Sequence, residues 1–104
     1  MSRNLFTENE IILCTYLALY DTSAYNEADI QEKFNRPESS IKMKIQNIAA
    51  MLDEENITRH SNVKGLSGVT TGEKGRRTNW NWVDKVITLS KEDFFKKCET
   101  ILSV

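Results

Sequence analysis

The stretch RPESSIKMKIQNIAAML, residues 36–52, decides how this chain is expected to fold. At about 100° per residue its branched apolar side chains fall in one narrow stripe: Ile41, Ile45, Ile48 and Leu52. The opposite side carries small, amide and thioether side chains with two lysines at its edges: Ser39, Ser40, Met43, Gln46, Asn47 and Ala50, flanked by Lys42 and Lys44. The pattern predicts an amphipathic helix, with one face for a core and one that can enter a groove.

A shorter helical pattern precedes this stretch. Residues 27–34 carry Ala28, Ile30 and Phe34 at core spacing and are acidic in the first turn, which suits the positive end of a helix. Residues 35 and 36 interrupt the pattern, and Pro37 suits the first turn of the next helix because it has no amide hydrogen to leave unpaired. A short helix, a tight turn and a longer helix together predict a helix-turn-helix.

Both ends of the chain also show helical signals. Thr7 and Glu10 fit a capping box at the start of a helix. The apolar residues between positions 11 and 19 lie on most of the circumference of this helix, so we expect it at the centre of a bundle. Ser90 resembles a helix N-cap, followed by one apolar face of Phe94, Cys98, Ile101 and Leu102. Residues 79–89 favour a short helix, with a strand as the alternative.

The expected fold is therefore mainly α: a small helical bundle with a helix-turn-helix core, a long basic loop or wing and a C-terminal helix. At 104 residues the chain is expected to be one domain. The core would cover about residues 7–52, the loop 53–78 and the closing segment 79–104. The loop holds all four glycines, whose spacing matches neither a P-loop nor G-x-G-x-x-G.

Charge is distributed unevenly along the chain. The net charge is -1, but residues 1–35 carry six acidic and two basic side chains, whereas residues 36–85 carry nine basic and six acidic ones. Positive charge thus gathers in the segment that begins with the amphipathic helix, where a phosphate backbone could be met without a basic protein overall.

Side chains of that segment fit the chemistry of DNA recognition. Lysine pairs with phosphate or guanine, asparagine and glutamine can pair with adenine, and serines at a helix start allow close approach of a phosphate. The candidate DNA-binding residues are Arg36, Ser39, Ser40, Lys42, Met43, Lys44, Gln46 and Asn47 in the helix, and Lys64, Lys74, Arg76 and Arg77 in the loop. The competing interpretations are a solvated helix face and a solvated loop.

Trp80 and Trp82 could stack on a flipped base, although tryptophans more often belong to the core.

Catalysis and metal binding are not expected. No Ser/His/Asp or Cys/His catalytic set can be assembled convincingly around the single histidine, His60. The carboxylates cluster at helix starts, where capping explains them. Cys14 and Cys98 lie in apolar helical patterns and are interpreted as buried hydrophobic side chains. No cofactor or metal is expected. With no signal peptide and no apolar run long enough to span a bilayer, we expect a cytoplasmic location and no membrane contact.

Several segments resemble a known module. They are FTENEIIL at 6–13, SSIKMKIQNIA at 39–49, KGLSG at 64–68 and the tryptophan segment at 80–83. Together they are similar to the N-terminal domain that precedes the nuclease domain in many HNH-type and modification-dependent restriction endonucleases, over about residues 6–88. The resemblance implies a DNA-binding specificity module, in some members for modified bases. We do not expect a counterpart of that family's metal-binding nuclease in this chain, because about twenty residues follow the tryptophan segment and His60 is the single histidine.

The sequence therefore predicts a non-catalytic module that binds double-stranded DNA, with dependence on sequence or base modification. It would be linked to restriction or its regulation. The alternative is a protein-interaction module, such as a regulator or inhibitor of a restriction-type or other nucleic-acid enzyme. The acidic first third supports that alternative, since it could meet a basic partner. The oligomeric state is left open.

Overall fold

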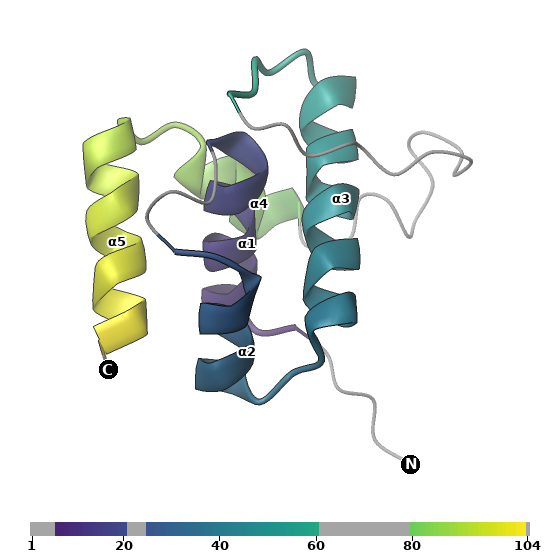
Figure 1. Cartoon of the computed structure of the whole chain (residues 1–104). Coiled ribbons are helices and arrows are strands. Elements are labelled where there is room, and N and C mark those ends of the chain that lie inside the picture. The colour runs from purple at the N-terminus through teal and green to yellow at the C-terminus, as the bar shows by residue number, and fades with distance from the viewer. Residues whose placement is uncertain (1–5, 21–24, 61–79, 104) are drawn as a thin grey trace.

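The computed structural model describes residues 6–20, 25–60 and 80–103, and these ranges contain five α-helices. The helices are α1 Glu8–Leu19, α2 Glu27–Phe34, α3 Glu38–Glu54, α4 Trp80–Val86 and α5 Lys91–Ser103 (Figure 1). These ranges contain no strand, which confirms the mainly α prediction. The predicted glycine-bearing wing lies mostly outside the described residues.

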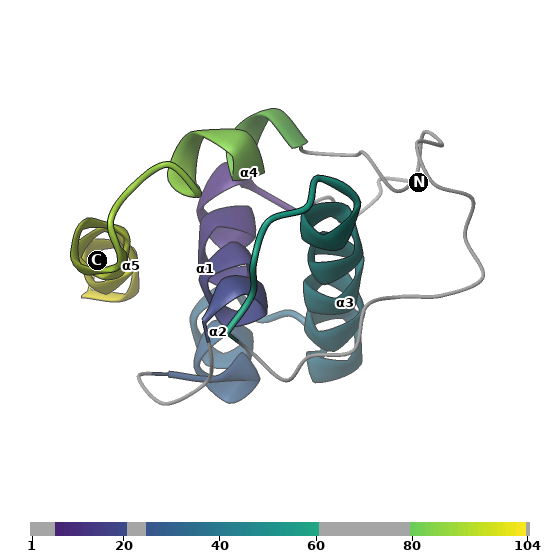
Figure 2. The same ribbon diagram turned by 90° about the horizontal axis from the view of Figure 1, so that it is seen from above.

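Helix α1 is the centre of the bundle. Every side chain from Glu10 to Leu19 is buried, as the apolar residues around its circumference predict. Helix α1 packs against all four other helices, and both views place α3 and α5 on opposite sides of it (Figures 1 and 2). Helix α3 also packs on α2. The position of α3 is therefore set by two neighbours, α1 and α2.

The start of α1 forms the predicted capping box. The Glu10 amide donates to Thr7 Oγ1 at 3.3 Å, and the Thr7 amide donates to Glu10 Oε1 at 2.8 Å. Helix α2 begins with a second capping box, between Asn26 and Asp29, which sequence inspection missed. Its signal was an asparagine followed three residues later by an acid.

A three-residue connection, residues 35–37, joins α2 to α3. Helix α2 ends where Asn35 adopts a left-handed conformation with φ of 53°, which asparagine tolerates well. Pro37 is extended, with ψ of 137°, and α3 begins one residue later. The sequence predicts Pro37 in the first turn of this helix; it is instead the N-cap residue, and Arg36 lies outside the helix because a residue that precedes proline disfavours the helical conformation.

The buried face of α3 is the one that the sequence predicts. Ile41, Ile45, Ile48 and Leu52 are all buried in the main core. Two face assignments were wrong. Ala50, expected on the polar face, is buried because α3 is enclosed from Ile48 to Leu52. Ala28, expected in the core, is exposed at the start of α2.

The described part of the closing segment, residues 80–103, forms two helices, α4 and α5. Residues 80–86 form α4 rather than a strand, and its Val83 and Val86 are buried. Trp80 and Trp82 are half-buried and pack against the core, which favours their structural interpretation. The Asp93 amide donates to Ser90 Oγ at 3.2 Å, so the predicted N-cap of α5 is confirmed.

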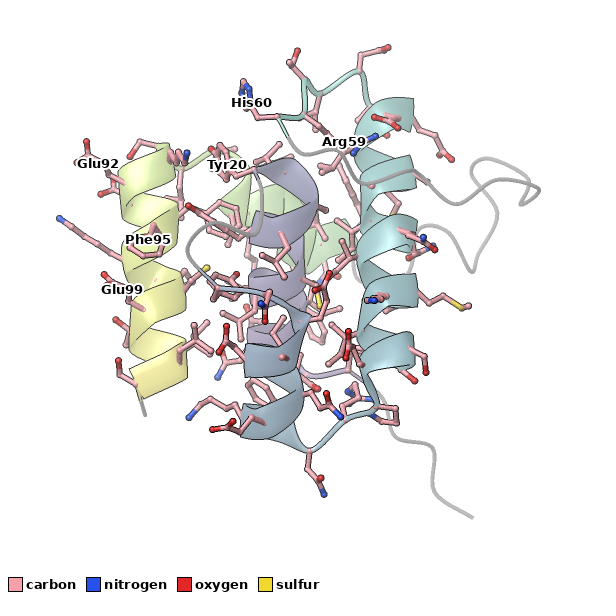
Figure 3. All side chains as sticks on the ribbon, in the orientation of Figure 1. Tyr20, Arg59, His60, Glu92, Phe95 and Glu99 are labelled. Atoms are coloured by element: carbon pink, nitrogen blue, oxygen red, sulfur yellow. The ribbon has the colours of Figure 1, made fainter. Side chains whose placement is uncertain are left out.

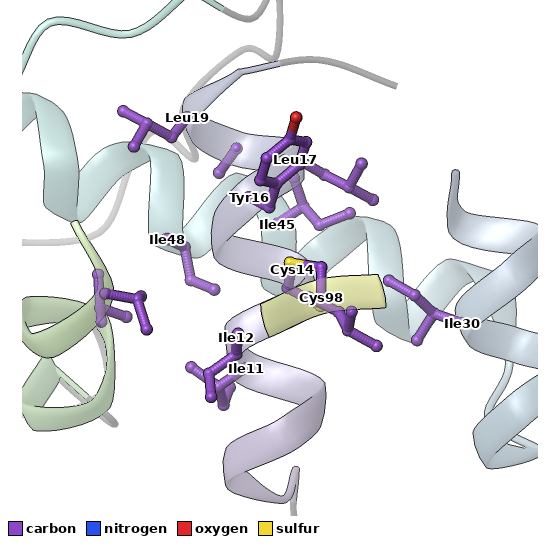
Figure 4. Close-up of a cluster of buried hydrophobic side chains, with 14 of the residues drawn as sticks. Ile11, Ile12, Cys14, Tyr16, Leu17, Leu19, Ile30, Ile45, Ile48 and Cys98 are labelled. Atoms are coloured by element: carbon purple, nitrogen blue, oxygen red, sulfur yellow. The ribbon is translucent and has the colours of Figure 1, made fainter. Parts of the chain in front are cut away.

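The two cysteines are buried free thiols, as predicted, and both belong to the core cluster (Figure 4). Burial raises the pKa of the Cys98 thiol to about 11, although a hydrogen bond with Tyr25 lowers it somewhat. Both thiols are therefore protonated at neutral pH and act as small apolar side chains.

No helix in the described ranges has the length and apolar character that crossing a membrane requires.

Candidate nucleic-acid interface

The first two turns of α3 present an exposed surface made of Ser39, Ser40, Lys42 and Met43, here called the α3 face. It lies opposite the buried isoleucines, so packing against α1 and α2 holds the helix while the face stays open. Met43 is 60 % exposed. Four of the predicted site residues thus come together on one accessible surface.

The next three candidates are only partly accessible. Lys44, Gln46 and Asn47 are half-buried. The Lys44 ammonium lies 5.2 Å from the centre of the Phe6 ring, and burial lowers its pKa. The Asn47 Oδ1 atom is buried with no hydrogen-bond partner among the described residues. A paired contact between Asn47 and adenine therefore requires this side chain to rotate.

Arg36 lies inside the protein, away from the α3 face. It is 7 % exposed, and its Nε and Nη2 atoms donate to the two carboxylate oxygens of Glu10 at 2.5 and 3.0 Å. Its guanidinium also stacks 3.9 Å from the centre of the Phe6 ring. Arg36 therefore contacts Glu10 and Phe6 in the interior and does not belong to the exposed α3 face.

Glu10 joins two parts of the fold through one buried carboxylate. It accepts from the Thr7 amide at the start of α1 and from Arg36 in the connection between α2 and α3. Burial alone would raise the pKa of Glu10, but the hydrogen bonds from Arg36 and Thr7 and the charge of Arg36 bring it below the usual 4.5. The carboxylate is therefore ionised at neutral pH.

The lowered pKa predicts an acid-sensitive contribution to stability. A carboxylate whose pKa is lower in the folded than in the unfolded protein stabilises the fold fully when the pH is above the unfolded pKa, here 4.5. This stabilisation is lost as the pH falls from 4.5 through the folded pKa. We expect the wild type to lose stability more steeply over that interval than the double variant Glu10→Gln/Arg36→Met, which lacks the pair. Urea unfolding between pH 6 and 3 checks this. If the unfolding free energies of the two proteins fell with pH along parallel curves, the prediction would be contradicted.

Local charge on the α3 face is mixed. Lys42 Nζ lies 3.2 Å from Glu38 Oε2, and both side chains are about half exposed, so this ion pair is weak and can open. The positive end of a helix favours an anion, but the Glu38 carboxylate in the first turn opposes one. Glu38 therefore weakens any phosphate contact at this end, a role that sequence inspection missed.

The loop candidates Lys64, Lys74, Arg76 and Arg77 lie outside the described residues. Within the described ranges, acidic side chains outnumber basic ones by thirteen to nine. The described ranges therefore carry a net negative charge.

The chain after α3 is fixed to the end of α1. The His60 amide donates to the Leu19 carbonyl at 2.7 Å, and the His60 ring stacks on Tyr20 with an interplanar angle of 2° (Figure 3). Arg59 pairs with Asp53 through both carboxylate oxygens. No sequence signal linked His60 to α1, because the two are far apart along the chain. The contact holds residue 60, which lies within the loop predicted over residues 53–78, against the end of α1.

In the described ranges no group of histidine, cysteine or acidic side chains is arranged to hold a metal ion.

Comparison of the chain with family models, with curated proteins and with solved structures finds no match. The resemblance to the restriction-endonuclease module stays a prediction.

Proposed function

We propose that this protein is a non-catalytic module that binds double-stranded DNA. In this proposal α2, residues 35–37 and α3 act as a helix-turn-helix, and the first two turns of α3 enter the major groove. The observation that carries it is the α3 face, an exposed polar surface at the N-terminal end of a helix whose other side is buried. The N-terminal residues of a recognition helix are the ones that contact base edges.

The side chains of the α3 face suit this role. Ser39 and Ser40 can donate to phosphate or base oxygens, and Lys42 can pair with phosphate or guanine. Gln46, one turn further along, can reach an adenine. The proposed wing would supply the positive charge that the described ranges lack, with Lys64, Lys74, Arg76 and Arg77 along the phosphate backbone.

Two substitutions one turn apart test the proposal because they should act in opposite directions. We expect Lys42→Gln to weaken duplex binding and to reduce the slope of log affinity against log salt by about 0.9 for the lost phosphate contact. We expect Glu38→Gln to strengthen binding, because it removes a carboxylate that repels phosphate. Fluorescence anisotropy with labelled duplexes over a salt series measures both effects.

Lys96→Gln is the matched control. It makes the same charge change at an exposed position of α5, on the other side of α1. An equal loss of affinity in Lys96→Gln and Lys42→Gln would show that net charge alone controls binding, and would count against the α3 face.

A second candidate function is a protein-interaction module, such as a regulator or inhibitor of a restriction-type or other nucleic-acid enzyme. One observation favours it: the exposed acidic side chains of α2, Asp29 and Glu32, outnumber the basic Lys33 in the lining of an open groove of about 460 Å³. Tyr25 and Leu102 of α5 complete this lining. A basic partner would complement this surface. Co-purification of a partner that is lost in Asp29→Asn/Glu32→Gln, without any duplex binding, would select this function over the first.

A further inference from the structure

Met43 stands out among the apolar side chains of α3. The helix buries Ile41, Ile45, Ile48 and Met51, whereas Met43 is 60 % exposed. It is the large hydrophobic side chain that the described residues leave open to solvent. A single exposed apolar residue is ordinary on a protein surface, so its meaning depends on its neighbours.

Those neighbours suit close approach to a base pair. Ser39 and Ser40 lie one turn before Met43 on the same face, and their small side chains leave its thioether as the most prominent apolar group there. Lys42, beside it, is exposed and forms a solvent-exposed ion pair with Glu38, so it can hold a phosphate once that pair opens. The thioether of methionine is flexible and polarizable, so it adapts to small apolar groups.

The major groove offers one apolar group on the base edges, the C5-methyl group of thymine, which 5-methylcytosine also carries. The minor groove offers none. We propose that Met43 contacts the C5-methyl group of a pyrimidine in the major groove and makes the affinity depend on it. This inference rests on the proposed DNA-binding function and adds the chemical group that the α3 face recognises.

Duplexes that differ only in the methyl group test it. The probes are the alternating duplexes poly d(A-T) and poly d(A-U), and poly d(G-C) and poly d(G-m5C). We expect the wild type to bind the methylated member of a pair about three- to fourfold more tightly for each methyl contacted, from the free energy of burying one methyl group. A preference in the first pair assigns thymine, and one in the second assigns 5-methylcytosine.

The control variant is Met43→Gln, which keeps the length and exposure of the side chain but removes its apolar end. We expect its affinities within each pair to be equal. Binding by the wild type without preference in either pair would overturn the inference and leave the proposed function standing. A preference that persists in Met43→Gln would also overturn it, since duplex shape would then be the cause. If no duplex is bound, the proposed function fails and this inference fails with it.

Discussion

Replacing Arg36 by methionine is expected to lower the free energy of unfolding by about 3–5 kcal/mol, because it leaves the buried Glu10 carboxylate without its charged partner. Glu10 is 2 % exposed and receives two hydrogen bonds from Arg36. In the variant, burial would no longer be offset by Arg36, so the pKa of Glu10 should rise above its wild-type value. Urea denaturation at pH 7 measures the loss of stability.

The Arg59 and Asp53 pair provides a matched control. Arg59 also donates to both oxygens of one carboxylate, at 2.9 and 3.1 Å, but the Asp53 side chain is 52 % exposed. We expect Arg59→Met to cost no more than about 1 kcal/mol, since solvent screens that pair.

The double variant Glu10→Gln/Arg36→Met should recover most of the stability lost in Arg36→Met, because no unpaired charge is then buried and glutamine can still accept from the Thr7 amide. Equal losses in Arg36→Met and Arg59→Met would contradict the buried-pair account.

Phe94→Ala is expected to destabilise the protein by about 3–5 kcal/mol, the usual cost of removing a buried aromatic ring from a core. Phe94 is fully buried and meets two rings edge-on: Tyr16 of α1 at 5.3 Å and Tyr20, the C-cap residue of α1, at 6.1 Å between centroids. These contacts attach α5 to the central helix. Thermal unfolding followed by circular dichroism measures the loss.

Phe95→Ala is the control for this variant, because the two rings are neighbours in sequence and differ in burial. Phe95 is half-buried and only tilted against Tyr16, at 5.8 Å. Its loss should therefore be clearly smaller. If Phe95→Ala cost as much as Phe94→Ala, the assignment of Phe94 as the core residue of α5 would be wrong.

Local signals in the sequence were sufficient to predict the mainly α class and the helices of the described ranges. The capping box at Thr7, the bounds of α2 and the buried stripe of α3 all depend on side chains within one or two turns of each other. Ala50 was assigned to the exposed face because helical periodicity shows only the direction in which a side chain points. How much of the helix circumference is buried depends on the neighbouring elements, which periodicity does not show. The helix-turn-helix and the wing stay predictions.

The candidate site was predictable only in part, because its limits depend on contacts between distant residues. Arg36 resembled a phosphate ligand beside a helix start, but it pairs with Glu10, which lies 26 residues earlier in the chain. Glu10 already had a role in the predicted capping box, so nothing in the sequence indicated a second partner for this carboxylate. Sequence inspection thus placed the polar face correctly at Ser39, Ser40 and Met43, and overestimated how far it extends toward Asn47.

The claim that the first two turns of α3 meet DNA is tested most directly by amide chemical shifts. Titration of the isotopically labelled chain with a duplex at low salt is expected to shift or broaden the amide signals of residues 38–46 most, while those of α5 stay in place. Signals that do not move at any duplex concentration, or that move mainly in α2 and α5, would contradict the account.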